Sequence, residues 1–281
     1  KAHNLTLKVM LDIVPAHCSS EHPWFVESRS STSNPKSDWF HWAEPKEDGS
    51  APTNWLSFFG GQAWTWEPRR QQYYLHNFLP EQPNLNYANP AVLEEFNQIA
   101  KFWFDRGVDG FRLDAVHTIN ADSFPYKDNP ANPKFKLGPL PQDQQPFFRQ
   151  LHDAAQLNQP AIQDFCASYR RIADSYENDR FLMGEVDGDN DSAIIVSETF
   201  TKPGRLHATY NFDLLEWGGL TVKEIKEAIL KSAKVFNSTG RLSFAFSNHD
   251  VPRVATRQLK ALNVSPKDSD KMQILLLKLQ I

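Results

Sequence analysis

The sequence predicts an α/β fold whose parallel sheet belongs to a barrel. Short apolar runs typical of buried strands alternate along the chain with helical patterns, as they do in successive βα units. Several of these runs end in charged or polar residues, which is where parallel barrels place their functional groups. At 281 residues, the chain is also long enough to form an α/β barrel as a single domain.

The strands and helices follow from these patterns in chain order. A nearly continuous apolar run from Leu7 to Val14 predicts a parallel strand buried on both faces. Later apolar runs predict strands at 108–117, 181–186, 208–212 and 242–246. Helical spacing predicts helices at 90–107 with Pro90 in its first turn, at 147–175 interrupted by Pro160, at 222–236 capped by Thr221, and at 272–278.

Composition divides the chain into three segments. Residues 1–17 contain the first barrel strand. Residues 18–89 are rich in Ser, Pro, Asn, Gly and Trp, show little helical period and are too long for a simple loop. We therefore expect an irregular subdomain inserted after the first strand, with the rest of the barrel in residues 90–281. Within that part, residues 119–146 form a polar, proline-rich loop.

The stretch Val108–His117 has two contrasting faces. Strand alternation places Arg112 and Asp114 on one face and Phe111 and Leu113 on the other. A charged pair directed into a packed interior is costly unless a site uses it, so the pattern favours a catalytic strand. A purely structural ion pair between Arg112 and Asp114 is the alternative.

Composition also excludes some classes of function. The net charge is −4 and basic residues form no long run, which argues against a nucleic-acid-binding protein. No apolar segment indicates contact with a membrane. The two cysteines, Cys18 and Cys166, have no metal-ligand spacing, and such sparse use favours a reducing compartment such as the cytoplasm. Because the chain opens on Lys1 rather than Met, we expect an internal piece of a longer protein.

Polar groups follow four of the predicted strands. They are Asp12 with His17, Arg112 with Asp114, Glu185, and His249 with Asp250. Because the carboxyl ends of parallel strands converge on one face of a barrel, these groups are expected to form one site. Such a set could bind a divalent metal, perform acid–base chemistry on a sugar, or abstract a proton beside a carbonyl. The strands carry no H-x-H or carboxylate-rich ligand cluster, so no metal or cofactor is identified.

The same residues carry a resemblance to a known family. The four sequence regions of the α-amylase family, glycoside hydrolase family 13, resemble Asp12-Ile13-Val14-Pro15-Ala16-His17, Gly110-Phe111-Arg112-Leu113-Asp114, Gly184-Glu185-Val186 and Ser247-Asn248-His249-Asp250. The segment from Trp64 to Phe78 resembles the α-glucosidase and oligo-1,6-glucosidase branch in particular. The resemblance implies a TIM (β/α)8 barrel, incomplete here, of which this chain holds about strands three to seven. The first strands and the C-terminal β-domain would be absent from the chain.

The resemblance also implies an activity and a role for each site residue. The activity is that of a retaining α-glucosidase that hydrolyses terminal non-reducing glucose, expected to be α-1,4-linked, from short oligosaccharides, with transglucosylation as a possible second outcome. Asp114 would be the nucleophile, Glu185 the general acid/base, and Asp250 the carboxylate that stabilises the distorted sugar. The sugar would be bound by His17, Arg112, His249, Phe59 and Phe78, the last two as aromatic walls. Arg112 would keep Asp114 ionised, and burial would raise the pKa of Glu185.

Three positions depart from or refine the family pattern. Ala16 replaces an Asn that supports calcium binding in many amylases, so no calcium site is expected there. Asn84 stands where the branch often has Asp. Ala115 follows the presumed nucleophile, and small residues there accompany α-1,4 preference in the relatives, whereas Val accompanies α-1,6 preference.

Rival functions exist inside and outside this family. Within it, the rival is an oligo-1,6-glucosidase or a sucrose hydrolase or isomerase. Outside it, a non-catalytic barrel could serve as an interaction subunit, but the three carboxylates are all present. The expected partner is an oligosaccharide or disaccharide, with no nucleic acid and no membrane. Because an unclosed barrel leaves strand edges unpaired, we expect this segment alone to be inactive and prone to aggregation.

Overall fold

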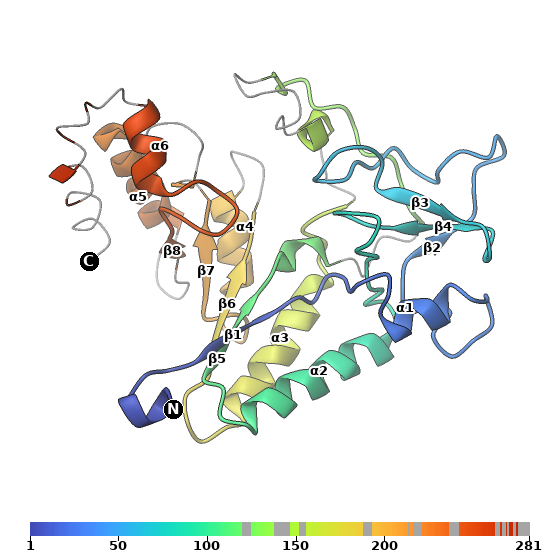
Figure 1. Cartoon of the computed structure of the whole chain (residues 1–281), viewed down its shortest axis with the longest axis horizontal. Coiled ribbons are helices and arrows are strands. Elements are labelled where there is room, and N and C mark those ends of the chain that lie inside the picture. Colours follow the sequence, from blue (N-terminus) through green and yellow to red (C-terminus); the bar gives the residue numbers. More distant parts are fainter. Residues whose placement is uncertain are drawn as a thin grey trace. The chain divides into compact units, whose positions relative to one another are not determined.

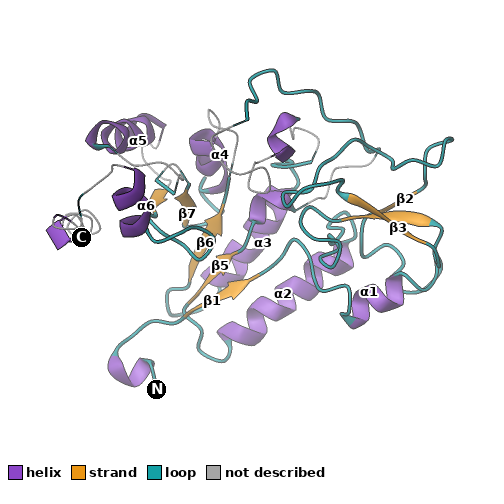
Figure 2. Cartoon of the chain, turned by 45° about the horizontal axis from the view of Figure 1, so that its top comes forward, coloured by secondary structure: helices purple, strands orange, loops and turns teal. Residues whose placement is uncertain are grey.

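The computed structural model describes residues 1–119, 125–137, 147–151, 156–187, 193–212, 214–215, 221–235 and 242–261, together with 265, 268, 270–271 and 274 (Figure 1). The chain divides into two compact units, Lys1–Glu185 and Val186–Ile281. Both units contain strands and helices, coloured in Figure 2, and these alternate along the chain except for three short strands that follow one another between residues 42 and 75. This alternation confirms the predicted α/β class.

A parallel sheet forms the centre of the first unit. Its strands β1 (Met10–Ile13), β5 (Gly110–Leu113) and β6 (Phe181–Glu185) lie in the order β1-β5-β6. The register places Asp12 beside Arg112, and Leu113 beside Gly184. All three strands were predicted, although each is shorter than its apolar run. The register brings the polar residues at the strand ends to one edge of the sheet.

Two helices pack against this sheet, α2 (Pro90–Phe104) and α3 (Ile162–Asp174), and they lie side by side (Figure 1). The ring of Phe111 on β5 lies 4.5 Å from that of Phe104 on α2. The hydroxyl of Tyr169 on α3 donates a hydrogen bond to the carbonyl of Phe96 at 2.9 Å. The apolar face of β5 is therefore covered by helices, and its charged face is turned away from them.

Local sequence signals set where these helices begin. The side chain of Asn89 accepts a hydrogen bond from the N–H of Ala91 at 2.9 Å, and Pro90 occupies the first turn. The helix therefore starts where the sequence predicts. The predicted helix at 147–175 is only partly present. Helix α3 begins just after Pro160, and residues 147–150 form a single 3-10 turn, η4 (Phe147–Gln150). Residues 152–155 lie outside the described residues.

Residues 18–89, the segment expected to be an insertion, contain a small sheet that the sequence pattern did not predict. Helix α1 (Pro23–Ser28) precedes a three-stranded antiparallel sheet of β2 (Trp42–Ala43), β4 (Gln72–Leu75) and β3 (Trp64–Glu67), in the order β2-β4-β3. Trp55, Trp64 and Leu75 form its buried core. Strands of two to four residues give almost no alternation to detect, so the pattern looked irregular throughout.

The second unit contains the later βα elements. Strands β7 (Ala208–Asn211) and β8 (Leu242–Phe244) pair in parallel, with helices α4 (Ala193–Phe200), α5 (Val222–Val235) and α6 (Val254–Ala261). Thr221 and Glu224 cap α5 reciprocally: each backbone N–H donates to the other residue's side-chain oxygen, at 2.6 and 3.3 Å. Both strands and α5 were predicted, whereas α4 and α6 were not. The predicted helix at 272–278 lies almost entirely outside the described residues.

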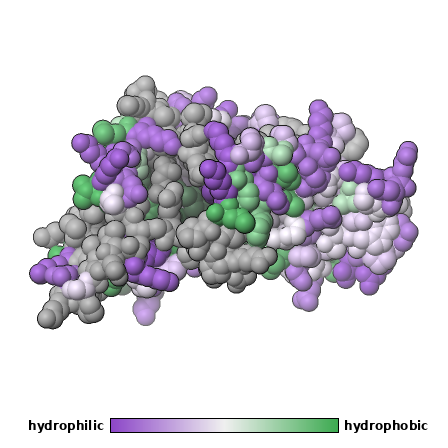
Figure 3. All heavy atoms as spheres, turned by 90° about the horizontal axis from the view of Figure 1, so that it is seen from above, coloured by the Kyte–Doolittle hydropathy of each residue, from purple (hydrophilic) through white to green (hydrophobic). Residues whose placement is uncertain are grey.

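The parallel strands of the first unit do not close on themselves. β1 is the edge strand of their sheet, and Met10 and Val14 beside that edge are each 41% exposed. Figure 3 shows one face of the molecule, where hydrophobic side chains lie among hydrophilic ones. An incomplete barrel is expected to expose apolar side chains at a strand edge, as Met10 and Val14 do here.

Candidate active site

Arg112 joins three carboxylates at the carboxyl end of the first unit's sheet. Its Nη1 donates to Asp12 Oδ2 at 2.8 Å and also to Asp114 Oδ1, while its Nη2 lies 2.5 Å from Glu185 Oε2. The acids come from three neighbouring places in the sheet: β1, the residue after β5, and the end of β6. The structure thus brings Asp114 and Glu185 together on one guanidinium, which Asp12 also contacts.

The backbone after β5 also holds Glu185. Ala115 has a left-handed conformation, with φ 40° and ψ 39°, and its N–H donates to Glu185 Oε2 at 2.9 Å. The hydroxyl of Thr118 donates to the carbonyl of Ala115 at 2.8 Å and closes the short helix η2 (Val116–Thr118). A non-glycine residue in this region costs about 1 to 3 kcal/mol, and such strain is concentrated at functional sites.

Three effects act on the pKa of Asp114, of which the sequence showed only that of Arg112. Burial raises the pKa of the Asp114 carboxyl, the negative charge of Glu185 raises it further, and Arg112 offsets only part of this effect. Arg112 therefore favours the ionised form of Asp114, as the resemblance implies, but burial and the charge of Glu185 together outweigh it. Asp114 and Glu185 thus share the single positive charge of Arg112.

His17 lies beside this cluster with its ring against Phe78, at 5.2 Å between ring centroids. Burial lowers the pKa of the His17 imidazole, although the charge of Asp114 acts in the opposite direction. Its Nε2 lies 2.9 Å from the amide nitrogen of Gln82, and its Nδ1 is buried with no hydrogen-bond partner among the described residues. His17 is therefore a neutral, oriented imidazole near the presumed nucleophile.

Aromatic rings form a group at the same place. Phe78 is half-buried and stacks on Phe58, at 5.2 Å and 22° between the rings, while Phe59 lies 5.5 Å from Phe78 and is 65% exposed. Phe58, which the sequence analysis did not single out, also meets His117 edge to face at 6.4 Å. An exposed ring next to a half-buried one can pack against the apolar face of a sugar.

His249 and Asp250 belong to the second unit. The N–H groups of Asp250 and Val251 donate to Asn248 Oδ1, at 3.0 and 3.1 Å. These two bonds form a turn in which the side chains of His249 and Asp250 are exposed to solvent. The buried Arg257 of α6 braces this turn: its Nε donates to the carbonyl of Pro252 at 2.9 Å, and its Nη2 donates to that of Phe246 at 2.5 Å. Sequence reasoning missed Arg257 because a single Arg on a helix carries no distinguishing pattern.

Buried amides connect the inserted segment to the loop after the presumed nucleophile. Asn84 is fully buried: its Oδ1 accepts from the N–H of Asn77 at 2.8 Å, and its Nδ2 lies 3.4 Å from the carbonyl of Thr118. Asn77 Nδ2 donates to the same carbonyl at 3.0 Å. His117, also missed, places its Nδ1 3.3 Å from the carbonyl of Glu185. Asn84 therefore supplies a hydrogen-bond donor that an Asp at this position would lack.

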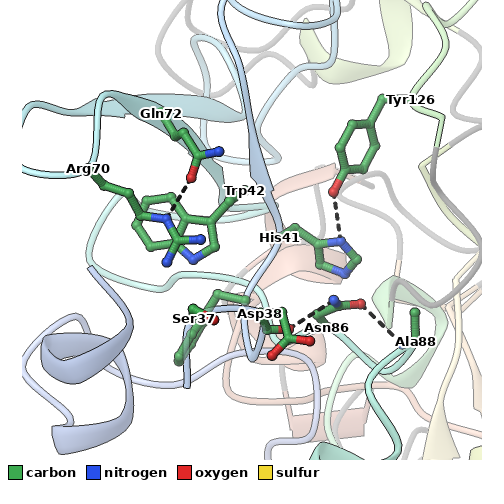
Figure 4. A pocket seen from close by; sticks show the side chains of 10 residues that line it. Ser37, Asp38, His41, Trp42, Arg70, Gln72, Asn86, Ala88 and Tyr126 are labelled. Carbon is green, nitrogen blue, oxygen red and sulfur yellow. Dashed lines mark hydrogen bonds between the residues drawn. The ribbon is translucent and has the colours of Figure 1, made fainter. Parts of the chain in front are cut away.

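A separate cavity of about 250 Å³ lies in the inserted segment and contains none of the predicted site residues (Figure 4). Trp42 lines it, but one face of its indole is covered by Arg70, at 4.3 Å from the ring centroid, and it stacks on Phe25 at 5.6 Å. Tyr126 and His41 close another side through a hydrogen bond of 3.1 Å. The Trp42 indole therefore offers no open stacking face to a sugar.

No metal or membrane feature occurs in the part of the chain that the structure describes. Among those residues, no group of three or more His, Cys, Asp and Glu side chains is arranged to hold a metal ion. No described helix combines the length and apolar character needed to cross a membrane.

Paired Asp and Glu side chains at the carboxyl ends of parallel strands are a feature of glycosidases with a barrel fold. The comparisons with known proteins agree. Residues 1–280 match the α-amylase family model, described as the α-amylase catalytic domain, and the chain belongs to this family. Its parallel strands are therefore part of an α-amylase-type (β/α)8 barrel that is incomplete in this chain.

Similar proteins cover nearly all of the chain. A probable α-glucosidase of Rhizobium meliloti is 42% identical over 259 residues, which is 92% of this chain and 46% of that protein. An oligo-1,6-glucosidase of Heyndrickxia coagulans is 33% identical over 274 residues, with the same two coverages of 92% and 46%. The crystal structure of the alpha-glucosyl transfer enzyme XgtA superimposes with a TM-score of 0.85 at 41% identity, over 92% of this chain and 48% of that one. The chain thus spans about half the length of the relatives it matches.

Proposed function

We propose that this protein acts as a retaining α-glucosidase on terminal, non-reducing α-linked glucose in short oligosaccharides, with α-1,4 linkages preferred. One observation carries the proposal: Arg112 binds Asp114 and Glu185 together, from adjacent strand ends. Retaining glycosidases need two close carboxyl groups, one to attack and one to protonate. The family assignment and the similarity to a probable α-glucosidase support the same reading.

In this proposal Asp114 attacks the anomeric carbon and forms a glucosyl ester while the glycosidic bond breaks. Glu185 donates its proton to the departing oxygen, and then takes a proton from the water that hydrolyses the ester. Ala115 N–H and Arg112 both bind Glu185 Oε2, so the transferred proton belongs on Oε1. Arg112 also orients Asp114, and Asp250 would stabilise the flattened sugar ring in the transition state.

The sugar-binding roles are part of the same proposal. His17 and His249 would donate hydrogen bonds to hydroxyl groups of the terminal glucose, and Phe59 and Phe78 would pack on its apolar faces. Residues 18–89 would act as an insertion that brings the two rings to the barrel. We expect no nucleic-acid or membrane partner. The two cysteines are free, which agrees with a reducing compartment such as the cytoplasm.

Two alternatives within the family have specific support. The similarity to an oligo-1,6-glucosidase favours isomaltose-type substrates, and the similarity to an alpha-glucosyl transfer enzyme favours transfer of glucose to a sugar hydroxyl rather than to water. A sucrose hydrolase or isomerase is a third variant of the same chemistry. A non-catalytic interaction subunit is the less favoured reading, because Asp114, Glu185 and Asp250 are all present.

The test compares initial rates of the intact protein on maltose, isomaltose, sucrose and trehalose, with and without an added acceptor sugar. We expect maltose to be turned over fastest and Asp114→Ala to abolish turnover of every substrate. The active protein should form α-glucose first, because retention preserves the anomeric configuration. Formation of β-glucose, or near-normal rates in Asp114→Ala, would reject the proposal.

A further inference from the structure

We infer that His76 is a positioning residue that sets the spacing between the aromatic rings of Phe59 and Phe78. These two rings lie 5.5 Å apart between their centroids. The inference deepens the proposed function and rests on it only in that the two rings bind the sugar. Because His76 is only 2% exposed, it acts through the backbone of Phe78 and not by touching substrate.

His76 directly follows β4, and the backbone holds it beside β3. Its N–H donates to the carbonyl of Ala63 at 2.8 Å, just before β3 begins. The buried imidazole lies between two oxygen atoms. Its Nδ1 is 2.9 Å from the carbonyl oxygen of Phe78, and its Nε2 is 2.9 Å from the hydroxyl of Thr65 on β3. Both ring nitrogens are therefore occupied within the protein.

The partners decide in which direction each hydrogen bond runs. The carbonyl of Phe78 can only accept, so Nδ1 of His76 carries a proton and donates to it. Burial lowers the pKa of His76, although the bond to Phe78 and the charge of Glu81 act in the opposite direction. In the neutral ring Nε2 is an acceptor, and the Thr65 hydroxyl donates to it.

The carbonyl of Phe78 joins two loops. From the second loop, the hydroxyl of Ser57 donates to the same oxygen at 2.6 Å, and the N–H of Phe59 donates to Ser57 Oγ at 3.1 Å. His76 and Ser57 thus supply two donors to one carbonyl oxygen. A continuous series of hydrogen bonds therefore connects His76, through Phe78 and Ser57, to the backbone of Phe59.

The loss of the His76 donor would leave the Phe78 carbonyl with one of these two hydrogen bonds. Its peptide could then tilt, and the ring of Phe78 would shift relative to that of Phe59, which Ser57 ties to the same oxygen. Aromatic rings pack on a sugar both in the bound substrate and in the transition state. Altered spacing should therefore weaken binding, which raises KM, and leave kcat unchanged.

Two substitutions of His76 in the intact protein separate the two hydrogen bonds of its ring. His76→Asn places an amide N–H at the position of Nδ1 and keeps the donor to Phe78, whereas His76→Gln reaches Thr65 and loses that donor. We expect KM for the best α-glucoside to rise about fivefold in His76→Gln at a wild-type kcat, and to stay near the wild-type value in His76→Asn. Crystal structures should show a longer separation between the rings of Phe59 and Phe78 in His76→Gln alone.

Ser57→Ala is the second variant, because it removes the other donor to the same carbonyl by a smaller change. It should raise KM and lengthen the ring separation even if His76→Gln does not fold. Ser28→Ala is its matched control: it removes a buried hydroxyl that accepts from the Trp42 indole N–H at 3.0 Å, also within residues 18–89, and should change neither quantity.

Two outcomes would overturn the inference. One is an equal KM in His76→Asn and His76→Gln, and the other is a wild-type ring separation in both His76→Gln and Ser57→Ala. A wild type that turns over no α-glucoside would reject the proposed function alone, since the ring separation is measured without turnover.

Discussion

The backbone N–H of Ala115 donates a hydrogen bond of 2.9 Å to Oε2 of Glu185, from a residue held at a φ of 40°. The residue that follows the proposed nucleophile therefore positions the proposed acid/base. Asp114 and Glu185 are linked twice, once through Arg112 and once through this strained turn. A change at Ala115 can act on the second carboxylate without removing either one.

Ala115→Val should shift the linkage preference. Ala115 is 5% exposed, so two added methyl groups must displace neighbours or protrude toward the substrate. We expect the ratio of kcat/KM on isomaltose to that on maltose to rise severalfold, because the family resemblance associates Val at this position with α-1,6 preference. Ala115→Gly, which keeps the N–H and tolerates the positive φ, should leave the ratio near the wild-type value. An unchanged ratio in Ala115→Val would show that Ala115 does not determine the linkage preference.

Arg112→Met should move the acidic limb of the kcat/KM profile to higher pH. The nucleophile must be ionised, and Arg112 is the group that lowers the pKa of Asp114 against burial and Glu185. Without the cation that pKa rises further, so activity should be lost about one pH unit earlier as the pH falls. Asp12→Asn is the opposing control, because it removes a competing anion and should shift the limb to lower pH. Shifts of both variants in one direction would contradict this electrostatic account.

Arg257→Met should impair the turn that carries Asp250. The buried guanidinium donates to the carbonyls of Phe246 and Pro252, and the variant leaves both without this donor. We expect a loss of about 2 kcal/mol in the free energy of unfolding and a drop in kcat larger than the change in KM. Lys260→Met, an exposed change on the same helix, should alter neither. Differential scanning calorimetry and steady-state kinetics on maltose measure the two effects.

Asn84→Asp should destabilise the protein even though the branch often has Asp at this position. The Nδ2 of Asn84 points at the carbonyl of Thr118, and a carboxylate there would face an oxygen in a fully buried place. We expect a loss of about 1 to 3 kcal/mol in the free energy of unfolding. Asn86→Asp also removes a donor, but from a half-buried side chain, and should cost less. Equal losses in the two variants would argue against a role for burial.

The sequence could identify residues whose position follows from regular structure. Alternation along β5 placed Phe111 against the helices and Arg112 away from them, and parallel strand ends brought Asp114 and Glu185 together. Asn89 and Pro90 also marked the start of α2, because helix capping depends only on residues that are neighbours in the sequence.

Contacts set by loops could not be read in this way. The pairing of Gln82 with His17 depends on how a long insertion returns to the sheet, and the bracing of the 247–252 turn by Arg257 depends on the packing of α6. The raised pKa of Asp114 was missed because burial and the Glu185 charge are properties of the folded site, whereas the neighbouring Arg112 is visible in the sequence. The sequence could therefore predict which residues lie together at the strand ends, but not the loop contacts and pKa shifts that modify them.

Trapping of the glucosyl intermediate tests the central claim most directly. A slow fluorinated α-glucosyl fluoride, incubated with the intact protein and quenched with acid, should add one glucosyl group by mass. Peptide mapping should place that group on Asp114, in the peptide that contains Arg112 and Ala115, and Asp114→Asn should take up no label. A label on Glu185 or Asp250, or rapid turnover with no covalent label at any carboxylate, would contradict the account.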